Sequence, residues 1–307
     1  MTTSRALVVR APAKINRTLR ILGRRQDGYH ELETEFQALD LHDTVTFVES
    51  PGPFRLRCSA PHVPLDRTNL VWRAAEALWR HAHGSSAPRN VTVTIDKQIP
   101  IGGGLGGGSS DAAAALVAFA RLWRLPVARK QMTAIAASLG ADVPFFLVGG
   151  FAFGRGRGDR LTRARDGATR RIVLLVPSFS VSTADAYTWY ASDRSDAIET
   201  ATRVAGATPR GRAVNEVNDL EAPVARRHPE ILRMTAALRR AGAVSASLSG
   251  SGATVFGLFG SKRAAEAAVA GLRRSAWSLL LTRTLTRGEY RRLVAPRWVR
   301  LPRLPAT

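Results

Sequence analysis

Cysteine is almost absent from this sequence, since Cys58 is the only one in 307 residues. A single thiol excludes an intramolecular disulfide framework and is typical of a reducing compartment, so we expect a cytoplasmic protein. The chain also lacks any run of 18 or more apolar residues and has no basic segment followed by an apolar leader. We therefore expect neither a secreted protein nor a membrane partner.

Acidic residues are few, at 24 against 45 lysines and arginines, which gives a formal net charge of +21. This sign suits nucleic acids and acidic small molecules equally well. The arginines are scattered and are not interleaved with aromatic residues that could stack on bases. An RNA-associated module is therefore retained only as the less favoured alternative. The six histidines show no zinc-ligand spacing with cysteine.

The length and a hydrophobic content of 45% predict a substantial core and two domains. The mixture of expected strands and helices predicts an α+β protein. We place the domains at residues 1–165 and 166–293, followed by a basic, proline-containing tail at 294–307 that we expect to be irregular. Residues 145–153 are predicted to be a strand, and residues 192–212 a loop or a poorly ordered segment. The span 154–171 is either a domain boundary or a hairpin.

The most informative segment is Pro100-Ile-Gly-Gly-Gly-Leu-Gly-Gly-Gly-Ser-Ser-Asp111, which follows a β-branched strand and precedes an alanine-rich helix. Backbone without Cβ atoms lets an anion approach the N–H groups closely. The start of the following helix adds unpaired N–H donors and the positive end of its dipole. The segment predicts a phosphate-binding loop.

Two common phosphate loops do not fit. A Walker A loop needs a lysine at the helix start, and the loop here ends Gly108-Ser109-Ser110-Asp111. The spacing of Gly102, Gly104 and Gly107 matches the dinucleotide fingerprint, but a second helical segment stands where that fold needs an acidic strand end.

Lys14 and Asp142 both lie in apolar surroundings, where an unpaired charge is costly. A lysine–aspartate pair beside a phosphate loop is suited to phosphoryl transfer to an alcohol. The aspartate can accept the hydroxyl proton, and the lysine can offset charge on the phosphoryl oxygens. The alternative for Asp142 is a structural cap.

Two further turns are candidates for ligand binding. In Gln26-Asp-Gly-Tyr-His30, the Asp-Gly pair suits a tight hairpin, and Tyr29 and His30 are able to stack on and hydrogen-bond a planar base. Ser249-Gly-Ser-Gly252 is either a simple hairpin turn or a second set of N–H groups facing the glycine loop.

Together these motifs resemble those of the GHMP kinases, in order and over about residues 8–259. The first is matched by Pro12-Ala-Lys-Ile-Asn16 with the adjoining 23–30, the second by 100–111, and the third by 249–252 with Asn218-Asp-Leu-Glu221 upstream. The segment 140–144 also fits. Arg17 departs from the family, which usually has an apolar residue there.

The resemblance implies a two-domain GHMP kinase fold, with an N-terminal domain like ribosomal protein S5 domain 2 and a C-terminal ferredoxin-like domain. It implies ATP and Mg²⁺ as cofactors. The Asp-Gly-Tyr-His element implies the 2-hydroxyl of 4-diphosphocytidyl-2-C-methyl-D-erythritol, of non-mevalonate isoprenoid precursor synthesis, as the acceptor. A homoserine- or mevalonate-type kinase is the alternative within the family. Monomer and homodimer both remain open.

The resemblance also implies roles for individual residues. Lys14 and Asp142 would be the catalytic pair, and Ser109 or Ser110 would lie near the metal. The ATP phosphates would be bound by Pro100, Ile101, Gly102, Gly103, Gly104, Leu105, Gly106, Gly107, Gly108, Ser109 and Ser110. The cytidylyl substrate would be bound by Asn16, Tyr29, His30, Thr183 and Tyr187.

Overall fold

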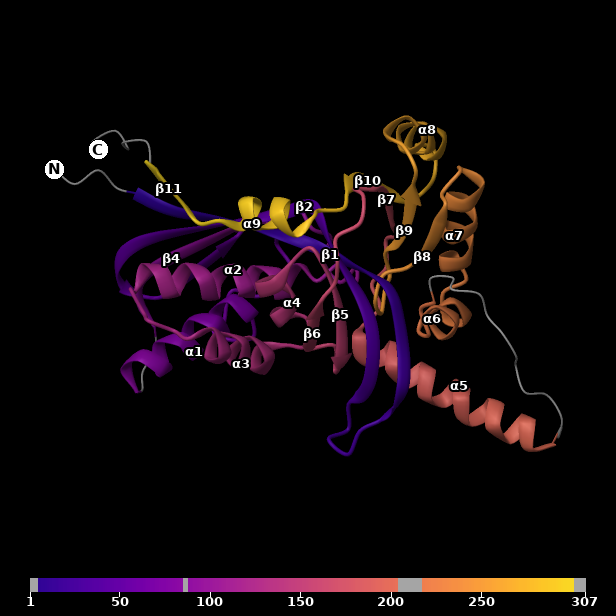
Figure 1. The fold of residues 1–307 in the computed structure, drawn as a ribbon, viewed down its shortest axis with the longest axis horizontal. Helices are drawn as coiled ribbons and strands as arrows, with labels where there is room; N and C mark the ends of the chain where they lie inside the picture. The colour runs from indigo at the N-terminus through magenta and orange to yellow at the C-terminus, as the bar shows by residue number, and fades with distance from the viewer. Residues whose placement is uncertain (1–4, 85–87, 204–216, 301–307) are drawn as a thin grey trace.

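The computed structural model describes residues 5–84, 88–203 and 217–300. Two sheets lie along the long axis of the molecule, each with its own helices (Figure 1). The larger sheet has seven strands with β11-β1-β2-β4-β3 as its main path, and β5 pairs with both β2 and β6. The smaller has four strands in the order β10-β7-β9-β8.

The bounds of the elements follow chain order. The larger sheet and its helices comprise β1 (Arg5–Arg24), β2 (His30–Pro53), β3 (Arg55–Cys58), α1 (Leu70–His83), β4 (Arg89–Asp96), α2 (Gly107–Leu122), α3 (Arg129–Leu139), α4 (Val143–Val148), β5 (Phe151–Gly156), β6 (Arg160–Arg163), α9 (Arg287–Val294) and β11 (Arg297–Arg300). The smaller sheet and its helices comprise β7 (Arg171–Val176), α5 (Thr183–Arg203), α6 (Glu221–Arg227), α7 (Glu230–Arg240), β8 (Ser245–Leu248), β9 (Val255–Phe259), α8 (Lys262–Leu272) and β10 (Ser278–Arg283).

Strands β1 and β2 form one long antiparallel hairpin that reaches from the larger sheet toward α5 (Figure 1). Their pairing register shifts between Pro12 and Lys14, between Asn16 and Thr18, and between Ile21 and Gly23. Such irregularities bend a strand and redirect its side chains without ending the pairing. Residues 14–16 therefore lie inside a strand that is locally distorted on both sides.

The core of the larger sheet lies between the strands and helices α1 and α2. Helix α1 begins where the Asn69 side chain accepts from the backbone N–H of Val71, as the N-cap rule predicts. Its apolar positions Val71, Ala74, Ala75 and Leu78 are all buried. From the far end of the chain, Leu285 and Tyr290 also pack into this core.

A separate apolar cluster joins the two sheets. Ala13 and Ile15 of β1 pack with Ile172 and Leu174 of β7 and with Phe256 of β9, all fully buried. Burial of apolar surface is the main favourable term in association, so this cluster holds the two halves in contact beside Lys14.

The prediction of a strand at residues 145–153 is wrong for its first part, because α4 covers Val143–Val148. Pro144 suits the first turn of a helix, and Gly149, with φ of 63°, ends it. The strand β5 begins only at Phe151. For the span 154–171, the hairpin alternative is correct, since β5 pairs with β6.

Two segments expected to be irregular are regular. The predicted loop at 192–212 is wrong up to Arg203, where α5 ends; residues 204–212 lie outside the described residues. The predicted irregular tail is wrong for Arg297–Arg300, which form β11 against β1, while residues 301–307 are not described. All four β11 residues are exposed, so the strand has no hydrophobic alternation that would reveal it.

Candidate active site

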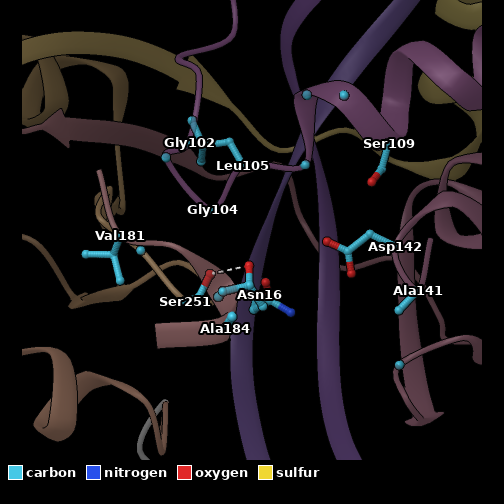
Figure 2. Close-up of a pocket in the computed structure, with 18 of the residues that line it drawn as sticks. Asn16, Gly102, Gly104, Leu105, Ser109, Ala141, Asp142, Val181, Ala184 and Ser251 are labelled. Carbon is cyan, nitrogen blue, oxygen red and sulfur yellow. Dashed lines mark hydrogen bonds between the residues drawn. The ribbon is translucent and has the colours of Figure 1, made fainter. Parts of the chain in front are cut away.

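A cavity of about 1130 Å³ lies between the two sheets and collects the motifs found in the sequence (Figure 2). It is lined by residues of β1, the glycine loop, the starts of α2 and α5, and the turn between β8 and β9. All the predicted site residues line it except Ser110, which is buried in α2. The structure thus brings together predicted site residues that are as far apart in the sequence as Lys14 and Tyr187.

Lys14 is buried, with a side chain only 4% exposed, and its ammonium has three polar neighbours. It donates to Asn16 Oδ1 at 2.6 Å and to the Gly104 carbonyl at 2.9 Å, and it lies 3.3 Å from Asp142 Oδ2. A buried ammonium needs such compensation. Lys14 and Asn16 are two residues apart in β1, so both side chains face the cavity.

Asp142, the third of these neighbours, extends its carboxylate into the cavity (Figure 2). Asp142 occupies the N-cap position of α4, but its side chain makes no capping hydrogen bond. The alternative of a structural cap is therefore wrong. Its side chain is 32% exposed, which leaves the carboxylate accessible to a ligand. Asp142 is therefore both paired with Lys14 and open to the cavity.

The glycine loop needs its glycines for two separate reasons. Gly102, Gly104 and Gly106 have φ of 67°, 73° and 72°, the left-handed region that favours glycine. A Cβ on Gly106 would also lie within 3.1 Å of the Lys14 side chain, so the loop must pass directly over the lysine. The backbone N–H of Lys14 donates to the Leu105 carbonyl at 2.9 Å, which ties β1 to the loop.

The turn Ser249-Gly-Ser-Gly252 joins the antiparallel strands β8 and β9, as the hairpin alternative predicted, and it also packs against the glycine loop. Ser249 Oγ donates to the Gly104 carbonyl at 3.0 Å, and the Thr254 N–H donates to the Gly103 carbonyl at 3.2 Å. The Gly104 carbonyl therefore accepts from both Lys14 and Ser249. Two motifs far apart in the sequence share one acceptor beside the lysine.

Asn218 and Glu221 fix the same turn from behind. Asn218 Nδ2 donates to the carbonyls of Leu248 and Gly250, each at 2.8 Å. Glu221 Oε2 accepts from Ser247 Oγ at 2.7 Å and from the Leu248 N–H at 2.8 Å. In the sequence, only the resemblance to the GHMP kinases singled out residues 218–221. In the structure, these residues hold the end of β8 and the following turn in place.

A second buried lysine was missed from the sequence. The Lys97 ammonium bonds to Asp43 and, at 2.9 Å, to Asp111 Oδ2 at the start of α2. Burial alone would lower the pKa of Lys97, but the two carboxylates together raise it. Burial raises the pKa of Asp111 to about 7. Two features of the sequence could have indicated this site: Lys97 is one of only four lysines, and it stands just before the glycine loop.

Ser109 and Ser110 differ in their suitability for a metal. Ser109 lines the cavity, and its hydroxyl lies on the side of Asp142 (Figure 2). Ser110 Oγ is buried and has no hydrogen-bond partner among the described residues. No cluster of three or more metal-ligating side chains occurs in the described part of the chain. Of the two serines, Ser109 is therefore the one whose hydroxyl could reach a metal ion bound to phosphates in the cavity.

The opposite end of the cavity is aromatic. The rings of His30 and Tyr187 stack with centroids 4.9 Å apart and an interplanar angle of 18°, and Tyr190 meets His30 edge-on. Burial, and then the charge of Arg24, lowers the pKa of His30, which favours the neutral form of its ring. Thr183 Oγ1 lies 3.1 Å from Ser251 Oγ, which connects α5 to the β8–β9 turn.

Comparison with family models gives two matches: the GHMP kinases N-terminal domain over residues 69–150, and the GHMP kinases C-terminal model over residues 206–278.

Among the described residues, no helix is both long and apolar enough to cross a bilayer.

The chain is similar to proteins named 4-diphosphocytidyl-2-C-methyl-D-erythritol kinase. It is 40% identical over 279 residues to the one from Pelotomaculum thermopropionicum, which covers 89% of this chain and 96% of that protein. It is 41% identical over 282 residues to the one from Pseudomonas savastanoi pv. phaseolicola, which covers 91% of this chain and 90% of that protein.

Solved structures show the same fold. A crystal structure of 4-(cytidine 5'-diphospho)-2C-methyl-D-erythritol kinase matches with a TM-score of 0.70 and 34% identity, over 90% of this chain and 98% of that one. Homoserine kinase from Cytophaga hutchinsonii matches with a TM-score of 0.65 but only 18% identity, and the match covers 97% of this chain and 98% of that one. The predicted two-domain fold is confirmed, and the chain belongs to the GHMP kinase family.

Proposed function

We propose that this protein uses ATP to phosphorylate the 2-hydroxyl of 4-diphosphocytidyl-2-C-methyl-D-erythritol, a step of non-mevalonate isoprenoid precursor synthesis. The observation that carries the proposal is the Lys14–Asp142 pair, 3.3 Å apart, directly beneath the glycine loop. Relatives with this activity in their names, at about 40% identity over most of the chain, support the choice of substrate.

In the proposed reaction, the acceptor hydroxyl oxygen attacks the γ-phosphorus of ATP while its proton passes to Asp142. The bond between the γ-phosphorus and the β–γ bridging oxygen breaks, and ADP leaves. Lys14 attracts the Asp142 carboxylate, 3.3 Å from its ammonium, and offsets the charge that develops on the phosphoryl oxygens. The burial of Lys14 strengthens both effects, because screening by water is weak there.

The N–H groups of the glycine loop and of the start of α2 would hold the phosphates, since the loop lines the cavity and six of its residues, the glycines of 102–108, carry no Cβ atom. Mg²⁺, held by Ser109 and the ATP phosphates, would supply charge neutralisation of the phosphates. Ser110 points into the protein and is not suited to that task.

At the aromatic end, Tyr29, His30 and Tyr187 would bind the cytosine, and Thr183 would lie beside it. Asn16 would place the acceptor alcohol, since its Oδ1 already lies next to the Lys14 ammonium. Its Nδ2 donates to Thr34 Oγ1 at 2.7 Å, which fixes the amide orientation.

The alternatives receive less support. Homoserine and mevalonate kinases share the fold, but their similarity to this chain is 18% or lower, which speaks for the fold alone. An RNA-associated module has no need for a buried lysine–aspartate pair under a phosphate loop.

The test is an ATP-coupled ADP-release assay with a panel of alcohols: the cytidylyl alcohol, mevalonate and homoserine. Turnover is expected only with the cytidylyl alcohol, and ³¹P NMR of the product is expected to show a new phosphate monoester. Preferential turnover of mevalonate or homoserine would reject the proposed substrate while leaving the kinase chemistry in place.

A further inference from the structure

Tyr29 stands at the edge of the cavity on the turn that joins β1 to β2, and it is 55% exposed. The turn is held mainly by its own residues: Asp27 Oδ1 accepts from the Tyr29 N–H at 3.2 Å, and Arg25 pairs with Asp27. These contacts fix the backbone of the turn but leave the aromatic ring unconstrained. A free ring must lose rotamer freedom when it binds a ligand, which weakens binding.

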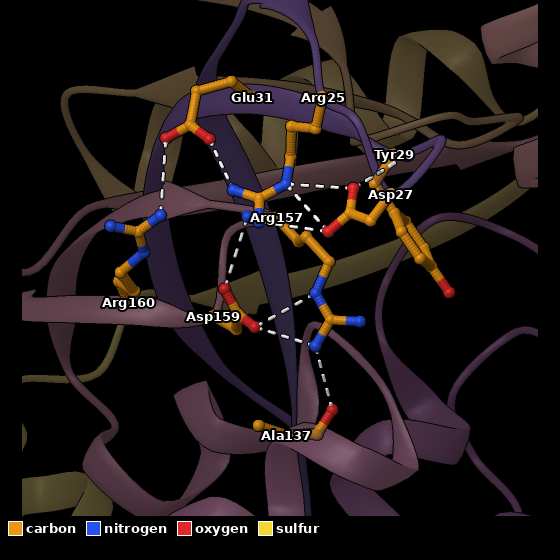
Figure 3. A network of polar contacts seen from close by, with 8 residues as sticks. All are labelled: Arg25, Asp27, Tyr29, Glu31, Ala137, Arg157, Asp159 and Arg160. Atoms are coloured by element: carbon orange, nitrogen blue, oxygen red, sulfur yellow. Dashed lines mark hydrogen bonds and ion pairs between the residues drawn. The ribbon is translucent and has the colours of Figure 1, made fainter.

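Arg157 supplies the missing constraint from the β5–β6 hairpin. Its guanidinium carbon lies 5.0 Å from the centre of the Tyr29 ring, in cation–π range (Figure 3). The cavity is lined by both side chains. The turn of β1–β2 and the turn of β5–β6 therefore meet at this pair of side chains, and Arg160 lies 3.9 Å from Glu31 beside it.

The guanidinium is itself held rigidly. Its Nε and Nη2 donate to Asp159 Oδ2 at 3.1 and 2.8 Å, and Nη2 also donates to the Ala137 carbonyl of α3 at 3.2 Å. The hydrogen bond with Asp159, and to a smaller extent Tyr29, raises the pKa of Arg157. The planar fork of arginine suits this use, because hydrogen bonds in its plane leave its face for the ring.

We propose that Arg157 is a positioning residue that holds the Tyr29 ring in place for stacking on the base of the substrate, with Asp159 and Ala137 as its anchors. This inference rests on the proposed function. It means that recognition of the cytidylyl end depends on the β5–β6 hairpin as well as on the Tyr29-His30 element. ATP, bound at the glycine loop, does not depend on this contact.

The first test is Arg157→Met, which keeps an apolar stem and removes the guanidinium. KM for the cytidylyl alcohol is expected to rise about tenfold, while kcat and KM for ATP stay within about twofold. Asp159→Asn, which loosens the anchor without touching Tyr29, is a milder variant with an expected rise of about threefold. The matched control is Arg155→Met: this exposed arginine of the same hairpin pairs with Glu33 and does not line the cavity, and KM is expected to change less than about twofold.

The second test is a double-mutant cycle with Tyr29→Leu. If Arg157 acts through Tyr29, adding Arg157→Met to Tyr29→Leu raises KM no further. Losses that multiply would overturn the proposal, since Arg157 would then act on the substrate by itself. An equal rise of KM for ATP in Arg157→Met would also overturn it. Wild-type turnover of the cytidylyl alcohol tests the proposed function separately, so the two failures are distinguishable.

Discussion

Gly104 lies so close to Ser249 that a Cβ atom on the glycine would be 2.1 Å from the serine carbonyl oxygen. The contact joins the glycine loop to the β8–β9 turn, and the Gly104 carbonyl on the same residue accepts from Lys14 and from Ser249 Oγ. Any side chain at this position would push the two loops apart and displace the acceptor of the lysine.

We expect Gly104→Ala to raise KM for ATP at least about tenfold, because the substitution adds a backbone clash to a φ of 73°. Gly103→Ala should cost less, since its Cβ would meet the Thr254 hydroxyl, a side chain, at 2.5 Å. Gly260→Ala, with no atom within 4 Å, is the control. Initial rates against ATP concentration decide, and an unchanged KM in Gly104→Ala would contradict the expectation.

Asp142→Asn should lower kcat about 10²- to 10⁴-fold, since the amide keeps the shape of the side chain but cannot accept the proton. The Kd for ATP should stay within about threefold, because the phosphate loop is untouched. Single-turnover phosphorylation and ATP titration measure the two effects. Asp185→Asn, on the exposed first turn of α5, is the control. Near wild-type turnover in Asp142→Asn would remove the aspartate from the mechanism.

His30→Ala should raise KM for the cytidylyl alcohol much more than KM for ATP, because the ring stacks on Tyr187 at the end of the cavity away from the glycine loop. A rise of about tenfold corresponds to the loss of one stacking contact and one hydrogen bond. His83→Ala, at the exposed end of α1, is the matched control. Equal effects on both substrates would argue against a role in base recognition.

Glu289 gives a prediction for pH and stability. It belongs to the capping box of α9, where hydrogen bonds from the Thr286 backbone first, then its hydroxyl and Arg283, lower the pKa of the carboxyl to about 2. A lowered pKa in the folded state stabilises the fold above the unfolded value of about 4.5, and this contribution is lost as pH falls from about 4.5 toward 2.

The stability advantage of the wild type over Glu289→Gln should therefore be constant above about pH 5 and shrink as pH falls below 4.5. Denaturant unfolding at a series of pH values between about 6 and 3 measures it. A difference that does not change over this range would mean that the capping interaction does not depend on the charge.

Much of the candidate site could be predicted because its residues lie in short motifs with local causes. The glycine run of 102–108 and the Asp27-Gly28 turn indicate special backbone conformations, and Lys14 in apolar surroundings indicates a paired charge. The errors in the fold also have a common cause. The helix at 192–203 and the strand at 297–300 carry no apolar periodicity, and short apolar runs such as 145–148 suit helix and strand equally.

The sequence by itself determined that the glycine run of 102–108 takes special backbone conformations and that Lys14 needs a partner, and from these residue types it predicted a phosphate loop and a base-binding element. Only the tertiary structure decided which groups meet: Lys14 with Asp142, Ser249 with Gly104, and Arg157 with Tyr29. Each of these contacts joins segments far apart in the chain. The Ser249–Gly104 distance depends on how the two sheets pack around one apolar cluster, and the other two distances depend on how the strands and helices of the larger sheet pack; no local pattern of residues encodes that packing.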